Sequence, residues 1–280
     1  MANVLKRLSR RSIVQAMTLA VFLPSARSAN AEIALATAIN RVARFRALSQ
    51  RSVKAYAQIA LNVLPEPSKN TLATAQKLIQ AAFDELSTNA YSDDITQQLA
   101  AIKTESAKLA TLLAVPAKKE FLAAASQQAD KLTAQANKGT ELLTGLTKTG
   151  NAKIIDIAGK QRLLSQRIAK NYFLLAANAT AASTAASTAS IRQQMTADRA
   201  EFKAAFTVMQ NSPISTQGIR NEIDLCNAQW FLFETSIDKT FDRPFVMEDV
   251  AVGSERLLEV ANNLTVLYEK ALKEVMGNRS

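Results

Sequence analysis

Apolar residues between positions 35 and 63 recur at the spacing of an amphipathic helix. At about 100° per residue they fall on a single stripe, which consists of Leu35, Val42, Phe45, Val53, Tyr56 and Ala60. Such a stripe predicts a helix that buries one face against neighbouring helices. The whole chain favours the same structure, because helix-forming residues are abundant and its 280 residues include only seven glycines and six prolines.

Prolines, glycines and short polar clusters divide the chain into eight predicted helices. These helices are expected at residues 32–64, 68–89, 92–115, 117–146, 152–178, 191–209, 216–241 and 247–276. The Ala/Ser/Thr-rich stretch 179–190 is expected to fray or to form a loop. Four helices joined by short loops are typical of an antiparallel four-helix bundle. The sequence therefore predicts an all-α protein of two tandem antiparallel four-helix bundles, residues 32–149 and 150–280.

One polar segment occurs twice in the chain. Residues 39–56 read INRVARFRALSQRSVKAY and residues 155–172 read IDIAGKQRLLSQRIAKNY. The identical pairs are Ile39/Ile155, Arg46/Arg162, Leu48/Leu164, Ser49/Ser165, Gln50/Gln166, Arg51/Arg167, Lys54/Lys170 and Tyr56/Tyr172. Agreement of this density indicates a duplicated unit. Repeats that serve only the core preserve apolar residues, so the mostly polar identities predict a role for R-x-L-S-Q-R itself.

The arginine that opens this motif faces the bundle. Arg46 lies about 40° from the centre of the apolar stripe, Ser49 lies within the stripe, and Gln50 follows Arg46 at i+4. In the second copy Arg162 has small neighbours at helical spacing, among them Gly159. By contrast Arg51 points almost opposite, where a solvated surface charge is expected.

A buried guanidinium needs hydrogen-bond acceptors and a counter-charge. Its planar fork suits oxyanions with two coplanar oxygens. Alternatively, Arg46 and Arg162 pair with acidic residues of neighbouring helices and hold the bundles together. The serines and glutamines of the motif are then ordinary interhelical hydrogen-bonding residues, namely Ser49, Ser165, Gln50 and Gln166. The residues alone leave both interpretations open.

Several kinds of chemistry are excluded or unsupported by the composition. The chain has no histidine, which excludes Ser-His-Asp catalysis, histidine metal sites and histidine pH switches. Its single cysteine, Cys226, cannot form an intramolecular disulfide and is expected to be a small buried residue. No carboxylate pair, phosphate-binding loop or metal-ligand spacing stands out. We therefore expect neither an enzyme nor a cofactor or metal site.

Residues 1–31 have the layout of a cleavable signal peptide: a basic start, a short apolar run and an A-x-A site at residues 29–31. Residues 9–14 (SRRSIV) resemble the twin-arginine (Tat) export motif, with Sec export as the alternative. The apolar run is too short to span a bilayer, which takes ~20 residues. Cleavage removes five basic residues and no acidic ones, so the formal net charge falls from +10 to +5. The remaining basic residues are interspersed with acidic ones, so we expect a periplasmic protein without a nucleic-acid partner.

The segment AGKQRLLSQRIAK at residues 158–170 resembles the signature of the PilJ-type domain, the N-terminal sensor region of type IV pilus chemotaxis transducers. It is also similar to the P-box of the NarX/NarQ nitrate sensor kinases, in which two A-G-x-x-R helices clamp one planar anion. The resemblance implies an anion site that includes Arg162 and Gly159 and, through the repeat, Arg46. The counterpart of the glycine is Ala43, so the first copy departs from the pattern.

The resemblance implies a soluble periplasmic sensor or binding protein for a small anion, nitrate or nitrite. It would signal to a membrane-bound sensor kinase, chemotaxis transducer or transporter. The alternative is a structural or adaptor bundle with no small ligand. If an anion binds, Arg46 and Arg162 either share one site across a pseudo-twofold axis or form two separate sites. The candidate anion-binding residues are Arg46, Arg162, Gly159, Ala43, Ser49, Ser165, Gln50 and Gln166.

Overall fold

The computed structural model describes residues 24–147, 151–178, 185–239 and 244–277. Within these ranges the chain forms helices only, and the predicted all-α fold is confirmed. The helices are α1 (Pro24–Ala60), α2 (Pro65–Ser87), α3 (Asp93–Leu113), a 3-10 turn η1 (Lys119–Phe121), α4 (Leu122–Gly145), α5 (Asn151–Asn178), α6 (Ala185–Gln210), α7 (Gln217–Ile237) and α8 (Pro244–Gly277).

Both halves of the chain arrange their four helices in the same way. In the first half α1 packs between α2 and α4, and α3 packs on α4; in the second half α5 packs between α6 and α8, and α7 packs on α8. The boundary expected near Gly150 falls between α4 and α5. The division into separate domains stays a prediction, because the two halves also share a large interface.

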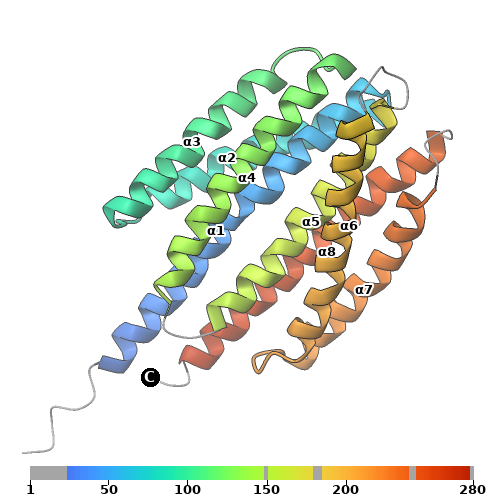
Figure 1. Ribbon diagram of the computed structural model, residues 1–280. Coiled ribbons are helices and arrows are strands. Elements are labelled where there is room, and N and C mark those ends of the chain that lie inside the picture. Colours follow the sequence, from blue (N-terminus) through green and yellow to red (C-terminus); the bar gives the residue numbers. More distant parts are fainter. Residues whose placement is uncertain (1–23, 148–150, 179–184, 240–243, 278–280) are drawn as a thin grey trace, which may run out of the picture.

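That interface is built by the two helices that carry the repeated motif. The helices α1 and α5 make the most extensive helix–helix contact in the described chain, flanked by smaller contacts of α1 with α8 and of α4 with α5. Figure 1 shows α1 and α5 running side by side in the same direction. A Cβ atom added to Gly159 would lie 3.9 Å from the Cβ atom of Ala43, its counterpart in the repeat. Equivalent positions therefore face each other, as they do across a twofold axis parallel to the two helices.

Several helices begin earlier than the sequence predicts. Prolines at positions 65 and 244, expected to break the chain, open α2 and α8 instead. Proline suits the first helical turn because its fixed φ angle is helical and its missing N–H needs no partner. Of the stretch 179–190, residues 185–190 are helical rather than frayed, and residues 179–184 lie outside the described ranges.

The apolar stripes meet in the core as expected. In the second half Trp230 is buried and stacks on Phe202 with the ring centroids 4.3 Å apart. Cys226 is fully buried as predicted, and burial raises the pKa of its thiol to about 12. Residues 1–23 of the predicted signal peptide lie outside the described ranges, and residues 24–31 form the start of α1. No described helix is both long and apolar enough to cross a membrane.

Candidate anion site beside the paired motif helices

A row of polar side chains is buried along the contact between α1 and α5. Its members recur at every fourth position, so they share one face of each helix. They are Arg46, Gln50 and Lys54 on α1 and Arg162, Gln166 and Lys170 on α5, all at most 2% exposed. Buried polar groups of this kind require partners, and the partners differ between the two helices.

Arg46 is neutralised by a carboxylate from the other motif helix. Its Nη2 donates to Asp156 Oδ1 on α5 at 2.6 Å, and its Nη1 donates to Asn137 Oδ1 on α4 at 3.2 Å. Its Nε donates to the carbonyl oxygen of Ala43 at 3.3 Å. This arginine therefore matches the interpretation of an internal ion pair.

Arg162 makes the equivalent three contacts with neutral partners only. Its Nε donates to the carbonyl oxygen of Gly159 at 3.3 Å, and its Nη1 makes a long contact of 3.5 Å with Asn262 Oδ1 on α8. Its Nη2 donates to Asn40 Oδ1 on α1 at 2.6 Å. Asn40 occupies the position in the repeat that Asp156 occupies in the second copy. The guanidinium of Arg162 makes no ion pair within the described residues.

The electrostatic surroundings of Arg162 disfavour its charge. Burial, and then the positive charges of Arg44 and Arg46, lower the pKa of Arg162 to about 9 from 12.5, although Glu269 acts in the opposite direction. The carboxylate of Glu269 does not touch the arginine; Asn40 Nδ2 donates to Glu269 Oε1 at 2.6 Å and so stands between them. An anion bound beside Arg162 would supply the negative charge that this guanidinium lacks among its contacts.

Gly159 leaves the space that the Arg162 side chain occupies. A Cβ atom at this position would lie 2.9 Å from Arg162 Nη2, which is closer than non-bonded contacts allow. The glycine of the motif therefore serves the arginine of its own helix. It lies opposite Ala43 where α1 and α5 approach each other.

The two motif serines support their own helices. Ser49 Oγ donates to the carbonyl oxygen of Arg46 at 2.9 Å, and Ser165 Oγ donates to that of Arg162 at 3.1 Å. Ser49 Oγ also lies 3.1 Å from Thr133 Oγ1 on α4. These bonds fix the turn that carries each arginine and leave the guanidinium groups to other partners.

The two motif glutamines hold α4 and α8 to the motif helices. Gln50 Nε2 donates to Asp130 Oδ1 on α4 at 3.0 Å, and Gln166 Nε2 donates to the carbonyl oxygen of Ser254 on α8 at 2.8 Å. The Oε1 atoms of both glutamines are buried and have no hydrogen-bond partner among the described residues.

Two buried lysines connect the halves of the molecule reciprocally. Lys54 on α1 donates to Ser254 Oγ at 2.8 Å and forms an ion pair with Glu255, both on α8. Lys170 on α5 forms an ion pair with Asp130 on α4 at 3.1 Å. Burial lowers the pKa of both lysines, and the carboxylates act against that shift.

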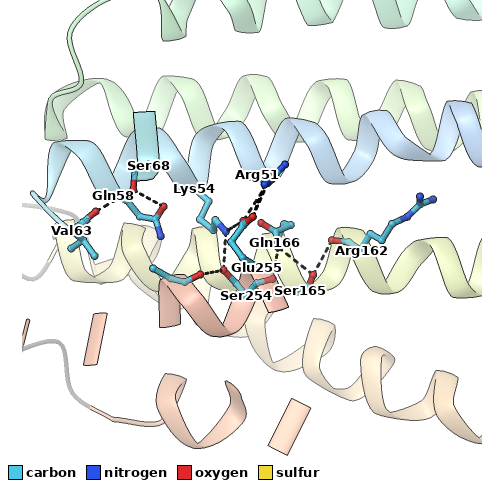
Figure 2. Close-up of polar contacts among 11 residues, drawn as sticks. Arg51, Lys54, Gln58, Val63, Ser68, Arg162, Ser165, Gln166, Ser254 and Glu255 are labelled. Carbon is cyan, nitrogen blue, oxygen red and sulfur yellow. Dashed lines mark hydrogen bonds and ion pairs between the residues drawn. The ribbon is translucent and has the colours of Figure 1, made fainter. Parts of the chain in front are cut away.

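Arg51 is not the solvated surface charge that its position on the helical wheel predicts. It is half-buried and binds Glu255 through Nε and Nη2, so that Glu255 receives both Arg51 and Lys54 (Figure 2). The wheel considers one bundle alone, whereas α8 of the other half covers this face of α1. Burial raises the pKa of Glu255, but the charges of Lys54 and Arg51 outweigh it and hold that pKa at about 2.

A cavity of about 190 Å³ lies next to Arg162, between α1, α2, α5 and α8. Its lining consists of Arg44, Ala47, Leu48, Arg51, Leu78, Arg162, Leu258, Asn262 and Val266. Three guanidinium groups therefore line one small space. The guanidinium of Arg44 makes no hydrogen bond or ion pair with the described residues. In Figure 2 the side chain of Arg162 extends from α5 toward α1, away from Ser165.

Residues 147–241 match the family model of the N-terminal region of type IV pili methyl-accepting chemotaxis transducers, called PilJ. This segment is a PilJ-type domain. It begins just before α5, ends just after α7 and contains the second copy of the motif. No match was found among curated proteins or among solved structures. The match supports a signalling role of the chemotaxis-transducer type for this part of the chain.

The PilJ-type segment contributes one arginine to the cavity, and the rest of the lining comes from α1, α2 and α8. Of the residues that the sequence singles out, Arg162 lines this cavity and Gly159 gives its side chain room, whereas Arg46, Ser49, Ser165, Gln50, Gln166 and Ala43 do not line it. The sequence analysis missed Arg44, Asn40 and Glu269. The signal for Asn40 was present in the repeat, as a neutral residue in one copy where the other has an acid.

Proposed function

We propose that the protein is a periplasmic sensor or binding protein for a small anion, which Arg162 holds at the cavity beside α5. It passes its ligand state to a membrane-bound sensor kinase, chemotaxis transducer or transporter. The PilJ-type domain supports the signalling role. The observation that carries the anion site is the buried guanidinium of Arg162, whose partners are all neutral while the equivalent Arg46 has a carboxylate.

The ligand group that suits this site is planar and has two coplanar oxygens. A guanidinium binds such a group with two parallel hydrogen bonds. Nitrate and nitrite have this geometry, and the resemblance of the motif to the P-box makes them the first anions to test. We propose one site per chain, at Arg162, because Asp156 already occupies the equivalent place beside Arg46.

We further propose that residues 32–149 are a diverged second copy of the PilJ-type unit. The chain then carries within itself the paired motif helices that two chains supply in a dimeric sensor. The reciprocal ion pairs of Lys54 and Lys170 reach the fourth helix of the opposite half. A shift of α5 against α1 on ligand binding would therefore also displace α4 and α8, because these ion pairs join them to the motif helices.

The periplasmic location rests on the signal peptide predicted at residues 1–31. We expect the exported protein to begin at Glu32. Mass spectrometry of a periplasmic fraction checks the start of the chain, and a protein that keeps residues 1–31 on the membrane would contradict this part of the proposal.

Isothermal titration calorimetry of the purified protein with nitrate and nitrite tests the anion site. We expect one anion per chain, and an anion at about 100 times its Kd should add about 2.7 kcal/mol to the free energy of unfolding. The absence of both effects with every planar anion would favour the adaptor alternative.

A substitution that supplies the missing counter-charge tests the mechanism without removing the arginine. Asn40→Asp places a carboxylate beside Arg162 Nη2 and is combined with Glu269→Gln, because Asn40 also donates to Glu269. The double variant is expected to lose anion binding. The matched control Glu269→Gln is expected to bind at least as tightly as the wild type, because a carboxylate near Arg162 has been removed. Equal binding by the double variant and the control would contradict the role of Arg162.

A further inference from the structure

We propose that the ligand of this cavity is a small organic carboxylate with an apolar body, larger than nitrate or nitrite. This inference rests on the proposed anion site and names the class of ligand it takes. The first observation is size. A cavity of about 190 Å³ holds the volume of about six water molecules, whereas nitrate fills roughly the space of two.

The charged end of the cavity fits one carboxylate. Arg51 is already engaged in an ion pair with Glu255, which it shares with Lys54. Arg162 and Arg44 remain, and neither makes an ion pair within the described residues. Burial is the main cause that lowers the pKa of both arginines, and the nearby carboxylates counter only part of that shift: Glu269 for both, Glu85 for Arg44 and Asp156 for Arg162. Two arginines without an ion pair therefore line one end of the cavity, where a single carboxylate can bind.

Apart from Asn262, the rest of the lining is apolar and comes from three helices. The apolar lining residues are Ala47 and Leu48 of α1, Leu78 of α2, and Leu258 and Val266 of α8. Leu78 is 42% exposed and Val266 is 55% exposed, so they form the rim at which a ligand would cover apolar surface now in contact with water. A bare oxyanion cannot cover these side chains. Burial of apolar surface is favourable by roughly 25 cal/mol per Å², so a ligand with an aliphatic or aromatic body gains affinity here.

Calorimetric titration with acetate, butyrate and benzoate, and with nitrate as the inorganic reference, tests the inference. Each buried methylene is expected to tighten binding about fourfold, so butyrate, which has two more methylenes, should bind roughly fifteenfold more tightly than acetate. Benzoate should bind more tightly than nitrate by a similar factor. The uncharged analogues butyramide and benzamide should not bind measurably, because the arginines select for the carboxylate.

Two substitutions at the rim separate the apolar contribution from the charge. Leu78→Ser and Val266→Ser are each expected to weaken butyrate and benzoate about threefold or more and to leave nitrate binding within about twofold. Both side chains are exposed, so the core is not disturbed. Val208→Ser is the matched control, because Val208 is 50% exposed on α6 and does not line the cavity.

The outcomes distinguish the inference from the proposed function. Equal affinity for nitrate, acetate and benzoate, unaffected by the rim substitutions, would overturn the inference and leave the anion site standing. Binding of benzamide as tight as that of benzoate would also overturn it, because charge would then play no part. No binding of any anion would overturn both proposals together. Rising affinity along the carboxylate series that is lost in Leu78→Ser and Val266→Ser supports the inference.

Discussion

Replacing Glu255 by glutamine is expected to lower the free energy of unfolding by about 3 kcal/mol at pH 7. The carboxylate of Glu255 faces two cations at once, Lys54 and Arg51, and Lys54 is fully buried. Removing one partner of a buried ion pair leaves an uncompensated charge, which costs about 3–5 kcal/mol. We take the lower end because the side chain of Glu255 is 32% exposed. Urea unfolding followed by circular dichroism measures the loss.

Acid provides an independent check of the same interaction. The pKa of Glu255 is held at about 2, below its ordinary 4.5, so its ion pairs stabilise the fold above pH 4.5. That stability is lost as the pH falls from about 4.5 to about 2. The difference in stability between the wild type and Glu255→Gln should therefore shrink over this range. A difference that stays constant down to pH 2 would contradict the assignment.

Asp130→Asn is the matched control for this prediction. Asp130 is the equivalent residue on α4, but it pairs with one lysine rather than with a lysine and an arginine, and its side chain is 43% exposed. A smaller loss of stability is expected. Adding Lys54→Met to Glu255→Gln should restore part of the stability lost, because no buried ammonium group is then left without a counter-charge.

The sequence predicted the fold well because its signals are local. The apolar stripe, the scarcity of glycine and the positions of the breakers each act within one helix, and the all-α fold followed from them. The errors at helix starts have a local cause too, since a proline that ends one helix can open the next, as at Pro65 and Pro244.

The candidate site was only partly predictable, because it lies between the two halves of the chain. A helical wheel for residues 35–63 identifies Arg46 as facing inward but places Arg51 in solvent. The error arises because a helical wheel describes a single helix and does not include α8, which packs on α1 from the other half of the chain. Lys54 and Lys170 are identical in the repeat and continue the four-residue spacing of Arg46 and Gln50, so their burial could have been predicted.

The difference between the two copies proved as informative as their identity. Repeats draw attention to matched residues such as Arg46 and Arg162, which suggested equal roles. The structure makes them unequal through one unmatched position, Asn40 against Asp156. The effect of a neutral residue in place of an acid can be recognised only when the arginine that it contacts is known. Each of these contacts joins α1 to α5, so the sequence alone does not show it.

Methionine substitutions at the two arginines are expected to change the stability of the fold to different extents. Arg46→Met should lower the free energy of unfolding by about 2 kcal/mol, because it leaves the 27% exposed Asp156 without its cation. Arg162→Met should stay within about 1 kcal/mol of the wild type when no anion is present. It removes a buried cation that has no counter-charge, and this gain offsets the hydrogen bond that Asn40 loses.

Anion binding, unlike stability, should depend on Arg162 and not on Arg46. Arg162→Met should abolish the stabilisation by nitrate or by a small carboxylate. The double variant Arg46→Met/Asp156→Asn removes the first ion pair as a neutral unit and should keep that stabilisation. Thermal unfolding of the wild type and of the three variants, with and without anion, measures the stability and the stabilisation by the anion, and isothermal titration calorimetry gives the stoichiometry.

The two arginines thus separate stability from ligand binding. Arg46 is expected to contribute to the fold and not to hold the anion, whereas Arg162 is expected to hold the anion at little benefit to the fold. A shared clamp predicts instead that Arg46→Met/Asp156→Asn and Arg162→Met lose the anion alike. Two independent sites predict that each variant keeps half of the bound anion, so the stoichiometry falls from two to one. Retention of the full stoichiometry of one in the double variant and its loss in Arg162→Met distinguish the single site from both alternatives, because only a site built on an uncompensated arginine gives that pair of results.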